Sequence, residues 1–260
     1  MHPVHIAELL QPFFSSPSYP CHSESGRRLG EEPAVLSATQ LQSISTYIDI
    51  LQRWNARFNL TAIRNEEEIV ARHFGESLFA ARNLFPREND QEAHDFSSAP
   101  ALSKGSAPPS ADPARGRKGA VVPAVADLGS GAGFPGLPIK LWASEISLTL
   151  IESNQKKAAF LREVARALTL TNVNIQNVRA EELNPDQTFD LVTLRAVERF
   201  TATLPTAARL VAPSGRLALL IGSSQVRETK GILPGFFWRP GIPIPGSKAR
   251  ILLVGMKEPR

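Results

Sequence analysis

A glycine-rich stretch in the middle of the chain, Val125 to Gly136, constrains the fold more than any other feature of the sequence. An apolar run that ends in an acid is followed by four glycines in eight residues, then by Pro135 and an amphipathic segment. This order is typical of a strand, a tight turn and a helix, because proline suits the first helical turn and glycine tolerates positive φ. The start of a helix presents N–H groups, so we expect the loop to bind a nucleotide-like ligand.

Two classes of ligand fit this loop equally well. Gly131 to Gly136 matches G-x-G-x-x-G, the pattern of dinucleotide-binding loops, and an acid follows on the next predicted strand. Asp127 to Gly133 matches the D-x-G-x-G-x-G loop of S-adenosylmethionine methyltransferases. The glycine pattern alone therefore leaves both classes open, and an ordinary strand-to-helix turn remains a third interpretation.

Composition narrows the class of protein. The chain of 260 residues has a formal net charge of +4 and one cysteine, Cys21. One cysteine excludes a disulfide framework and a cysteine-based zinc site, and we expect no bound metal. With neither a signal peptide nor about 20 consecutive apolar residues, we expect a cytoplasmic monomer without membrane attachment. A mildly basic balance permits a nucleic-acid partner.

Changes in composition divide the chain into four parts. Residues 1–36 form a loosely structured segment in which a short apolar piece is expected to dock as a helix. Residues 37–86 carry apolar residues at helical spacing and predict a helical subdomain. Residues 87–122 are rich in proline, serine and alanine and predict a disordered insertion. Residues 123–260 alternate strand-like and helix-like segments and form the main domain.

Cap signals mark helix starts in the helical subdomain. Ser37 and Gln40 have the spacing of a capping box, and Asn65 precedes three glutamates that favour the positive end of a helix. Arginines are interleaved with aromatic residues here, which permits a surface that contacts RNA phosphates and stacks on bases. The alternative, solvated arginines and core aromatic side chains on amphipathic helices, is favoured for any single residue. The set comprises Arg53, Trp54, Arg57, Phe58, Arg64, Arg72 and His73.

The main domain predicts a mostly parallel sheet covered by helices on both faces. Helices are expected over residues 135–142 and 156–168. A terminal strand pair without a long final helix suits a methyltransferase sheet better than a dinucleotide-binding domain. The expected strands are 124–128, 147–152, 173–178, 189–194, 215–221, 236–239 and 250–256.

Candidate site residues fall at the ends of these strands, where open α/β sheets bind ligands. Glu152 ends the second strand and is placed to accept hydrogen bonds from a ribose diol, a role common to both ligand classes. Ala180 and Glu181 follow the third strand, where methyltransferases hold the adenine edge. The full set at strand ends is Gly129, Gly131, Gly133, Glu152, Ala180, Glu181 and Arg195.

Together these stretches resemble the bacterial small-subunit ribosomal RNA guanine-N7 methyltransferase family, also called glucose-inhibited division protein B. The resemblance covers roughly residues 37–86 and 122–257. The N-terminal W-N-x-x-F-N-L-T element is the most specific part, because it lies outside the general methyltransferase pattern. The matching pieces are Trp54-Asn55, Phe58 to Ile63, Arg72 to Phe74, Asp127 to Gly136, Leu150 to Ser153, Lys157 to Leu161, Arg179 to Glu182 and Arg195-Ala196.

The resemblance implies a Rossmann-like class I methyltransferase sheet with a helical N-terminal subdomain. It further implies transfer of a methyl group from S-adenosyl-L-methionine to N7 of a guanine in 16S ribosomal RNA, as naked RNA or in the small subunit. Glu152 matches the ribose-binding acid, and Arg195 and His73 are the candidates for a role in catalysis. Asn59, Arg72 and His73 match positions near the expected RNA side. The cofactor contacts carried over are Gly129, Phe134, Ala180, Glu181 and Arg195.

Three departures from the family pattern stand out. Glu76 occupies a position where the family usually has aspartate. Ile221 precedes Gly222 where the family has lysine, and Arg216 or Arg227 is a candidate replacement. The third departure is the insertion at 87–122.

Two other functions are compatible with parts of the sequence. An NAD-dependent oxidoreductase follows from the embedded G-x-G-x-x-G, although no catalytic His–acid pair follows the fourth strand. A non-catalytic RNA-binding factor with a retained cofactor fold follows from the missing lysine. The chain has no nucleophile elbow and no P-loop.

Overall fold

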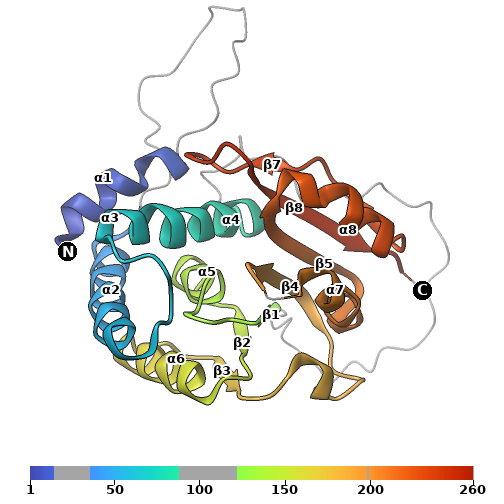
Figure 1. Cartoon of the computed structure of the whole chain (residues 1–260), viewed down its shortest axis with the longest axis horizontal. Coiled ribbons are helices and arrows are strands. Elements are labelled where there is room, and N and C mark those ends of the chain that lie inside the picture. Colours follow the sequence, from blue (N-terminus) through green and yellow to red (C-terminus); the bar gives the residue numbers. More distant parts are fainter. Residues whose placement is uncertain (15–35, 88–121, 198, 260) are drawn as a thin grey trace, which may run out of the picture.

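The computed structural model describes residues 1–14, 36–87, 122–197 and 199–259. Helical elements alternate with strands over the main domain, as Figure 1 shows. The helical elements are α1 (Pro3–Phe14), α2 (Ala38–Phe58), α3 (Glu66–Glu68), the π-helix η1 (Ile69–Gly75), α4 (Glu76–Leu84), α5 (Gly136–Trp142), α6 (Gln155–Ala167), the 3₁₀ turns η3 (Ala180–Glu182) and η4 (Ser223–Gln225), α7 (Phe200–Leu210) and α8 (Val226–Ile232). The strands are β1 (Ala124–Leu128), β2 (Ser147–Ile151), β3 (Val173–Gln176), β4 (Phe189–Arg195), β5 (Val211–Gly222), β6 (Phe236–Trp238), β7 (Ile242–Pro243) and β8 (Arg250–Lys257).

One sheet organises the main domain, with strand order β3-β2-β1-β4-β5-β8-β6. Strands β1 to β5 run parallel, whereas β8 is antiparallel to β5, β6 and β7. Leu128 at the end of β1 lies opposite Ile151 of β2 and Leu194 of β4, so the three strands end together. The predicted Rossmann-like α/β class is thereby confirmed, including the antiparallel terminal strands.

The start of β5 departs from the sequence prediction. The sequence predicts that this strand begins at Gly215. In the structure β5 already begins at Val211, which lies opposite Phe189, and the pairing register shifts between Phe189 and Leu191. The irregularity accommodates Pro213 and Ser214, and Ser214 has a φ of 60°. The strand therefore begins four residues before Gly215 and contains an irregularity in its pairing with β4.

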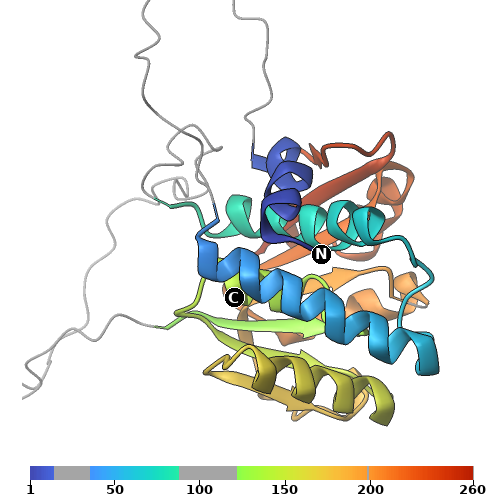
Figure 2. The same cartoon turned by 90° about the vertical axis from the view of Figure 1, so that its left-hand side faces the viewer.

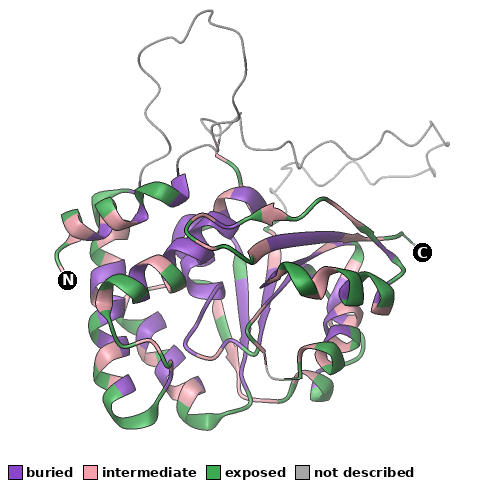
Figure 3. Cartoon of the chain, turned by 45° about the horizontal axis from the view of Figure 1, so that its top comes forward, coloured by how far each residue is buried: buried purple, intermediate pink, exposed green. Residues whose placement is uncertain are grey.

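Helices cover both faces of the sheet (Figures 1 and 2). Val125 and Leu191 face α5, α6 and the N-terminal helices, whereas Ala126 and Val192 face α7 and α8. This division follows from the alternation of side chains along a strand. Figure 3 shows the result, with buried strands at the centre and exposed residues on the outer faces of the helices.

Helix α1 is the docked helix expected within residues 1–36. Its apolar residues recur at helical spacing, and Ile6, Leu10 and Phe13 are buried against α2 and η1. The expected docked helix is therefore confirmed, and it comprises the twelve residues Pro3–Phe14. Residues 15–35 lie outside the described part of the chain, as does the predicted insertion between Arg87 and Val122.

The contact between α1 and η1 depends on the absence of a side chain at Gly75. A Cβ there would lie 2.3 Å from Cε2 of Phe13. Gly75→Ala is therefore expected to lower the free energy of unfolding by about 1–3 kcal/mol through overpacking, measured by urea denaturation. Gly231→Ala is the matched control, because it adds a Cβ with no atom within 4 Å on exposed helix α8. Equal unfolding midpoints for both variants would contradict the proposed role of Gly75.

The predicted helix caps are confirmed. Ser37 and Gln40 form a reciprocal capping box at α2, and the Asn65 side chain accepts the Glu68 N–H at α3. The helical subdomain then continues through η1 into α4 and lies against the sheet. Within the described residues, no helix is long and apolar enough to cross a membrane.

Candidate functional site

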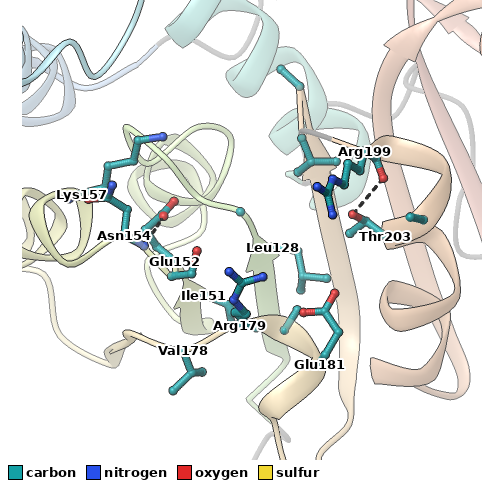
Figure 4. A pocket seen from close by; sticks show the side chains of 16 residues that line it. Leu128, Ile151, Glu152, Asn154, Lys157, Val178, Arg179, Glu181, Arg199 and Thr203 are labelled. Carbon is teal, nitrogen blue, oxygen red and sulfur yellow. Dashed lines mark hydrogen bonds between the residues drawn. The ribbon is translucent and has the colours of Figure 1, made fainter.

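A cleft of about 630 Å³ lies along the carboxyl ends of β1, β2 and β4 (Figure 4). Its size falls within the usual range for small-molecule sites, about 300–1,000 Å³. Polar and apolar side chains share its walls. The lining residues are Leu128, Gly129, Ile151, Glu152, Ser153, Asn154, Lys157, Val178, Arg179, Ala180, Glu181, Ala196, Val197, Arg199, Ala202 and Thr203.

The glycines of the loop between β1 and α5 have different structural roles. Gly129, Gly131 and Gly133 have φ of 64°, 56° and 86°, as the sequence predicted. A Cβ at Gly133 would lie 2.3 Å from Oη of Tyr47, so this position is also closed by the helical subdomain. Gly129 alone of the three lines the cleft. The other two shape the loop beneath it.

Glu152 joins the glycine loop to the beginning of α6. Its buried carboxylate accepts the Gly131 N–H at 2.9 Å and the Asn154 N–H at 2.8 Å. Each oxygen has a further lone pair, and the side chain lines the cleft. The acid is therefore positioned to accept a diol as well as to hold the loop.

The turn after β3 brings Ala180 and Glu181 to the same cleft. Both lie in η3, and Arg209 of α7 fixes the turn by donating a hydrogen bond to the Ala180 carbonyl at 3.2 Å. Glu181 is exposed, and Figure 4 shows its carboxylate across the cleft from Glu152. Of the predicted cofactor residues, the cleft thus brings together Gly129, Glu152, Ala180 and Glu181.

The apolar part of the cleft comes from Leu128, Ile151, Val178 and Val197. An adenosine group requires an acid that accepts hydrogen bonds from its ribose diol and apolar walls that contact its flat adenine ring. It also requires a glycine at the surface of the loop that it approaches. The residues present therefore fit the adenosine part of S-adenosylmethionine.

Asp127 at the end of β1 holds the loop from below. It is fully buried and accepts hydrogen bonds from the Thr193 hydroxyl at 2.8 Å and the Gly136 N–H at 3.2 Å. Burial raises the pKa of Asp127 to about 7, although these hydrogen bonds favour the ionised form. The acid conserves the geometry of the turn and does not line the cleft.

Arg195 lies at the end of β4 but does not line the cleft. Its guanidinium donates to the carbonyls of Arg72 and His73 in η1, and it lies 3.2 Å from the Glu76 carboxylate. Burial lowers the pKa of Arg195 to about 10, which leaves it charged at neutral pH. The structure thus places this predicted cofactor contact between the helical subdomain and the sheet.

His73 and Phe134 lie together in the same region. Their rings stack with centroids 4.6 Å apart, and the second face of Phe134 stacks on Tyr47 at 5.3 Å. His73 Nε2 lies 2.8 Å from the Thr61 hydroxyl and Nδ1 lies 3.3 Å from Arg195. Burial lowers the pKa of His73 to about 3, with Arg195 as the next cause. The imidazole is therefore neutral, accepting at Nδ1 and donating at Nε2.

The W-N-x-x-F-N-L-T element builds the turn that supports His73. Asn55 both accepts the Thr61 N–H and donates to the Thr61 carbonyl, at 2.9 and 3.0 Å. Asn59 ends α2 with φ of 47° and accepts a hydrogen bond from Arg64. Trp54 donates to Glu163 of α6 at 2.9 Å. The motif therefore fixes Thr61, and Thr61 fixes the imidazole.

Sequence reasoning missed the buried pair of Glu76 and Arg250. The Glu76 side chain is 3% exposed, and Arg250 of β8 lies 2.8 Å from it. Burial raises the pKa of Glu76, while Arg195 and Arg250 oppose that shift. The sequence signal for this pair was Glu76 itself, an acid among apolar residues shortly after the Arg72–His73 motif.

The candidate replacements for the family's lysine lie in different places. Ile221 is buried in β5 and pairs with Ile251. Arg216 lies opposite Leu191, away from the carboxyl end of the sheet, and donates to the Leu84 carbonyl at 3.1 Å. The expectation that Arg216 replaces the lysine at the site is therefore wrong, because its strand position points it to the opposite edge. Arg227 lies in α8, after the carboxyl end of β5, and does not line the cleft.

The chain matches the family model described as rRNA small subunit methyltransferase G over residues 40–98 and 114–232. It is 34% identical over 188 residues to "Ribosomal RNA small subunit methyltransferase G" of Xylella fastidiosa (strain 9a5c), covering 72% of each chain. It is 35% identical over 207 residues to the protein of the same name from Halorhodospira halophila, covering 80% of this chain and 81% of that one. Among solved structures, the ribosomal protein L11 methylase from Lactobacillus delbrueckii subsp. bulgaricus has a TM-score of 0.46 at 15% identity, covering 53% of this chain and 70% of that one.

Proposed function

The chain belongs to the rRNA small subunit methyltransferase G family, and we propose that it transfers a methyl group from S-adenosyl-L-methionine to N7 of one guanine in 16S ribosomal RNA. The observation that supports the proposal is the cleft in which Gly129, Glu152, Ala180 and Glu181 meet. The oxidoreductase and the non-catalytic factor receive no support from the comparisons. We further propose a cytoplasmic, monomeric protein that acts on naked RNA or on the small subunit.

The proposed reaction needs positioning more than proton transfer. Bound S-adenosylmethionine supplies an electrophilic methyl group, and guanine N7 carries a free lone pair. No base is therefore required, and neutral His73 is consistent with a supporting role. Arg195, anchored by Glu76 and by the carbonyls of η1, holds the helical subdomain against the end of β4. We infer that this contact sets the position of the RNA-binding side relative to the cleft.

The reaction is tested by transferring labelled methyl groups to small ribosomal subunits that lack the modification. Borohydride–aniline treatment cleaves RNA at N7-methylguanine and maps the product. One new cleavage site would support reaction, substrate and atom together. Label in the RNA without cleavage would contradict the N7 assignment. Absence of label both from the subunits and from deproteinised 16S RNA would contradict the proposed substrate.

Glu152→Ala is expected to weaken cofactor binding strongly. Hydrogen bonds to a charged acceptor contribute about 1.5–3 kcal/mol each, so loss of one corresponds to a dissociation constant raised by roughly 10- to 150-fold. Isothermal titration calorimetry with S-adenosylhomocysteine measures the change. Glu152→Asp keeps the carboxylate and is expected to retain most of the affinity. Unchanged affinity in the alanine variant would remove Glu152 from the cofactor site.

A further inference from the structure

The last turn of α2 meets the first turn of α6 at the rim of the cleft. Trp54 of α2 lies 5.8 Å from the ring of Phe160 in α6, and Figure 2 shows the two helices packed side by side. Lys157 in this turn of α6 lines the cleft (Figure 4), and Lys156 precedes it in the sequence. We call the surface formed by Arg53, Arg57, Phe58, Lys156 and Lys157 the α2–α6 corner.

An aromatic ring is exposed at the centre of this corner. Phe58 is 39% exposed, one of four large apolar side chains exposed in the described residues. Its ring lies 5.3 Å from Trp54, and Nζ of Lys156 lies 5.0 Å from its centroid. Trp54 is held by its hydrogen bond to Glu163, and its ring packs against Phe58 at an interplanar angle of 45°. Phe58 and Lys156 are both exposed, so this contact lies at the surface.

The charge around Phe58 is positive. Arg57 and Lys156 are exposed, and Arg53 is 69% exposed with a long contact of 3.7 Å to Glu163. An exposed ion pair of this kind contributes at most about 1 kcal/mol, so Arg53 can turn to an anionic partner at little cost. Proteins bind single-stranded nucleic acid on surfaces of this kind, where an exposed aromatic ring stacks on a base and nearby cations contact phosphates.

We propose that the α2–α6 corner binds a single-stranded RNA segment beside the target nucleotide, with one base stacked on Phe58 and its phosphates at Lys156 and Arg57. The proposal rests on the proposed function, because it takes the substrate to be RNA. Lys157 connects the corner to the cleft, so a strand bound there leads a neighbouring nucleotide toward the cleft.

Binding of a fluorescently labelled, deproteinised 16S ribosomal RNA fragment tests the corner without turnover. Phe58→Ala is expected to raise the dissociation constant on the order of tenfold, and Phe58→Trp to restore it. Lys156→Glu is expected to weaken binding and to reduce the dependence on salt by roughly 0.7 in log–log slope per lost contact. The controls are Phe237→Ala, an aromatic residue 66% exposed on strand β6, and Lys230→Glu on exposed helix α8. Calorimetric affinity for S-adenosylhomocysteine verifies that each variant is folded.

The outcomes separate the surface from the reaction. Weakened RNA binding by the corner variants, with normal binding by both controls, supports the proposal even if the wild-type protein transfers no methyl group to N7. Equal binding by Phe58→Ala and Phe237→Ala would overturn it. Weaker binding to intact subunits but not to deproteinised RNA would also overturn it, because the corner would then contact a ribosomal protein.

Discussion

Replacing Glu76 with alanine is expected to lower the free energy of unfolding by about 3 kcal/mol. Glu76 at the start of α4 lies between Arg195 of β4 and Arg250 of β8, at 3.2 and 2.8 Å. Its Oε2 is the one buried side-chain oxygen or nitrogen in the described residues without a hydrogen-bond partner, so the contact to Arg195 is electrostatic. Removing the acid leaves two neighbouring guanidinium groups unopposed, one of them in a buried position.

Urea denaturation at neutral pH measures this loss, and Glu68→Ala provides the control. Glu68 lies at the other end of the π-helix η1 from Glu76 and forms an ion pair with Arg72. Both side chains are about half exposed, at 45% for Glu68 and 46% for Arg72. Exposed pairs contribute less than about 1 kcal/mol. If Glu76→Ala were as stable as Glu68→Ala, the contacts of Glu76 with Arg195 and Arg250 would not stabilise the fold. Glu76→Gln keeps the shape and is expected to fall between the two.

Local signals predicted much of this fold. The positive φ angles of Gly129, Gly131 and Gly133 and the caps at Ser37 and Asn65 depend on neighbouring residues, and all are confirmed. The strand ends follow from apolar runs closed by acids or glycines. Because parallel strands end at the same edge of a sheet, the sequence also predicted that Glu152 and the turn at Ala180 lie in one cleft.

Contacts between distant segments could not be predicted in this way. Phe134 follows the glycine loop and was expected to touch a cofactor, but its two faces are filled by Tyr47 and His73, which come from the helical subdomain. Arg195 has the right strand position, yet its direction is set by the carbonyls of η1 and by Glu76. A sequence pattern places a residue at a strand end. It does not say which neighbour receives the side chain.

Two titratable groups, buried Asp127 and half-buried His73, are expected to give opposite pH dependences of stability. The pKa of Asp127 is raised from 3.8 to about 7, so its contribution to stability is present below pH 4 and is lost as the pH rises through 7. The pKa of His73 is lowered from 6.5 to about 3, so its contribution is present above 6.5 and is lost as the pH falls through 3. Between about pH 4 and 6.5 the two slopes oppose each other, and the wild-type protein is expected to show little pH dependence from this pair.

Asp127→Asn is expected to reveal the pH dependence of stability that His73 causes, because Asp127 no longer opposes it. The asparagine oxygen can accept the Gly136 N–H, and its amide can donate to the Thr193 hydroxyl, which can in turn donate to the Ala126 carbonyl at 3.3 Å. The fold is thus retained while the cost of a buried carboxylate disappears. A shift from 3.8 to about 7 corresponds to about 4 kcal/mol, so the variant should match the wild type near pH 4 and exceed its stability by about this amount at pH 8.

Urea denaturation from pH 4 to pH 8 measures this difference. In the variant, stability should rise with pH between about 4 and 6.5, by roughly 1.4 kcal/mol per unit, because His73 is then unopposed. Asp127→Ala separates charge from hydrogen bonding, because it leaves the Gly136 N–H without its partner at every pH and should be less stable than Asp127→Asn throughout. A difference between wild type and Asp127→Asn that stays constant from pH 4 to pH 8 would contradict the raised pKa. The buried acid would then be ionised throughout, held by Thr193 and Gly136 alone.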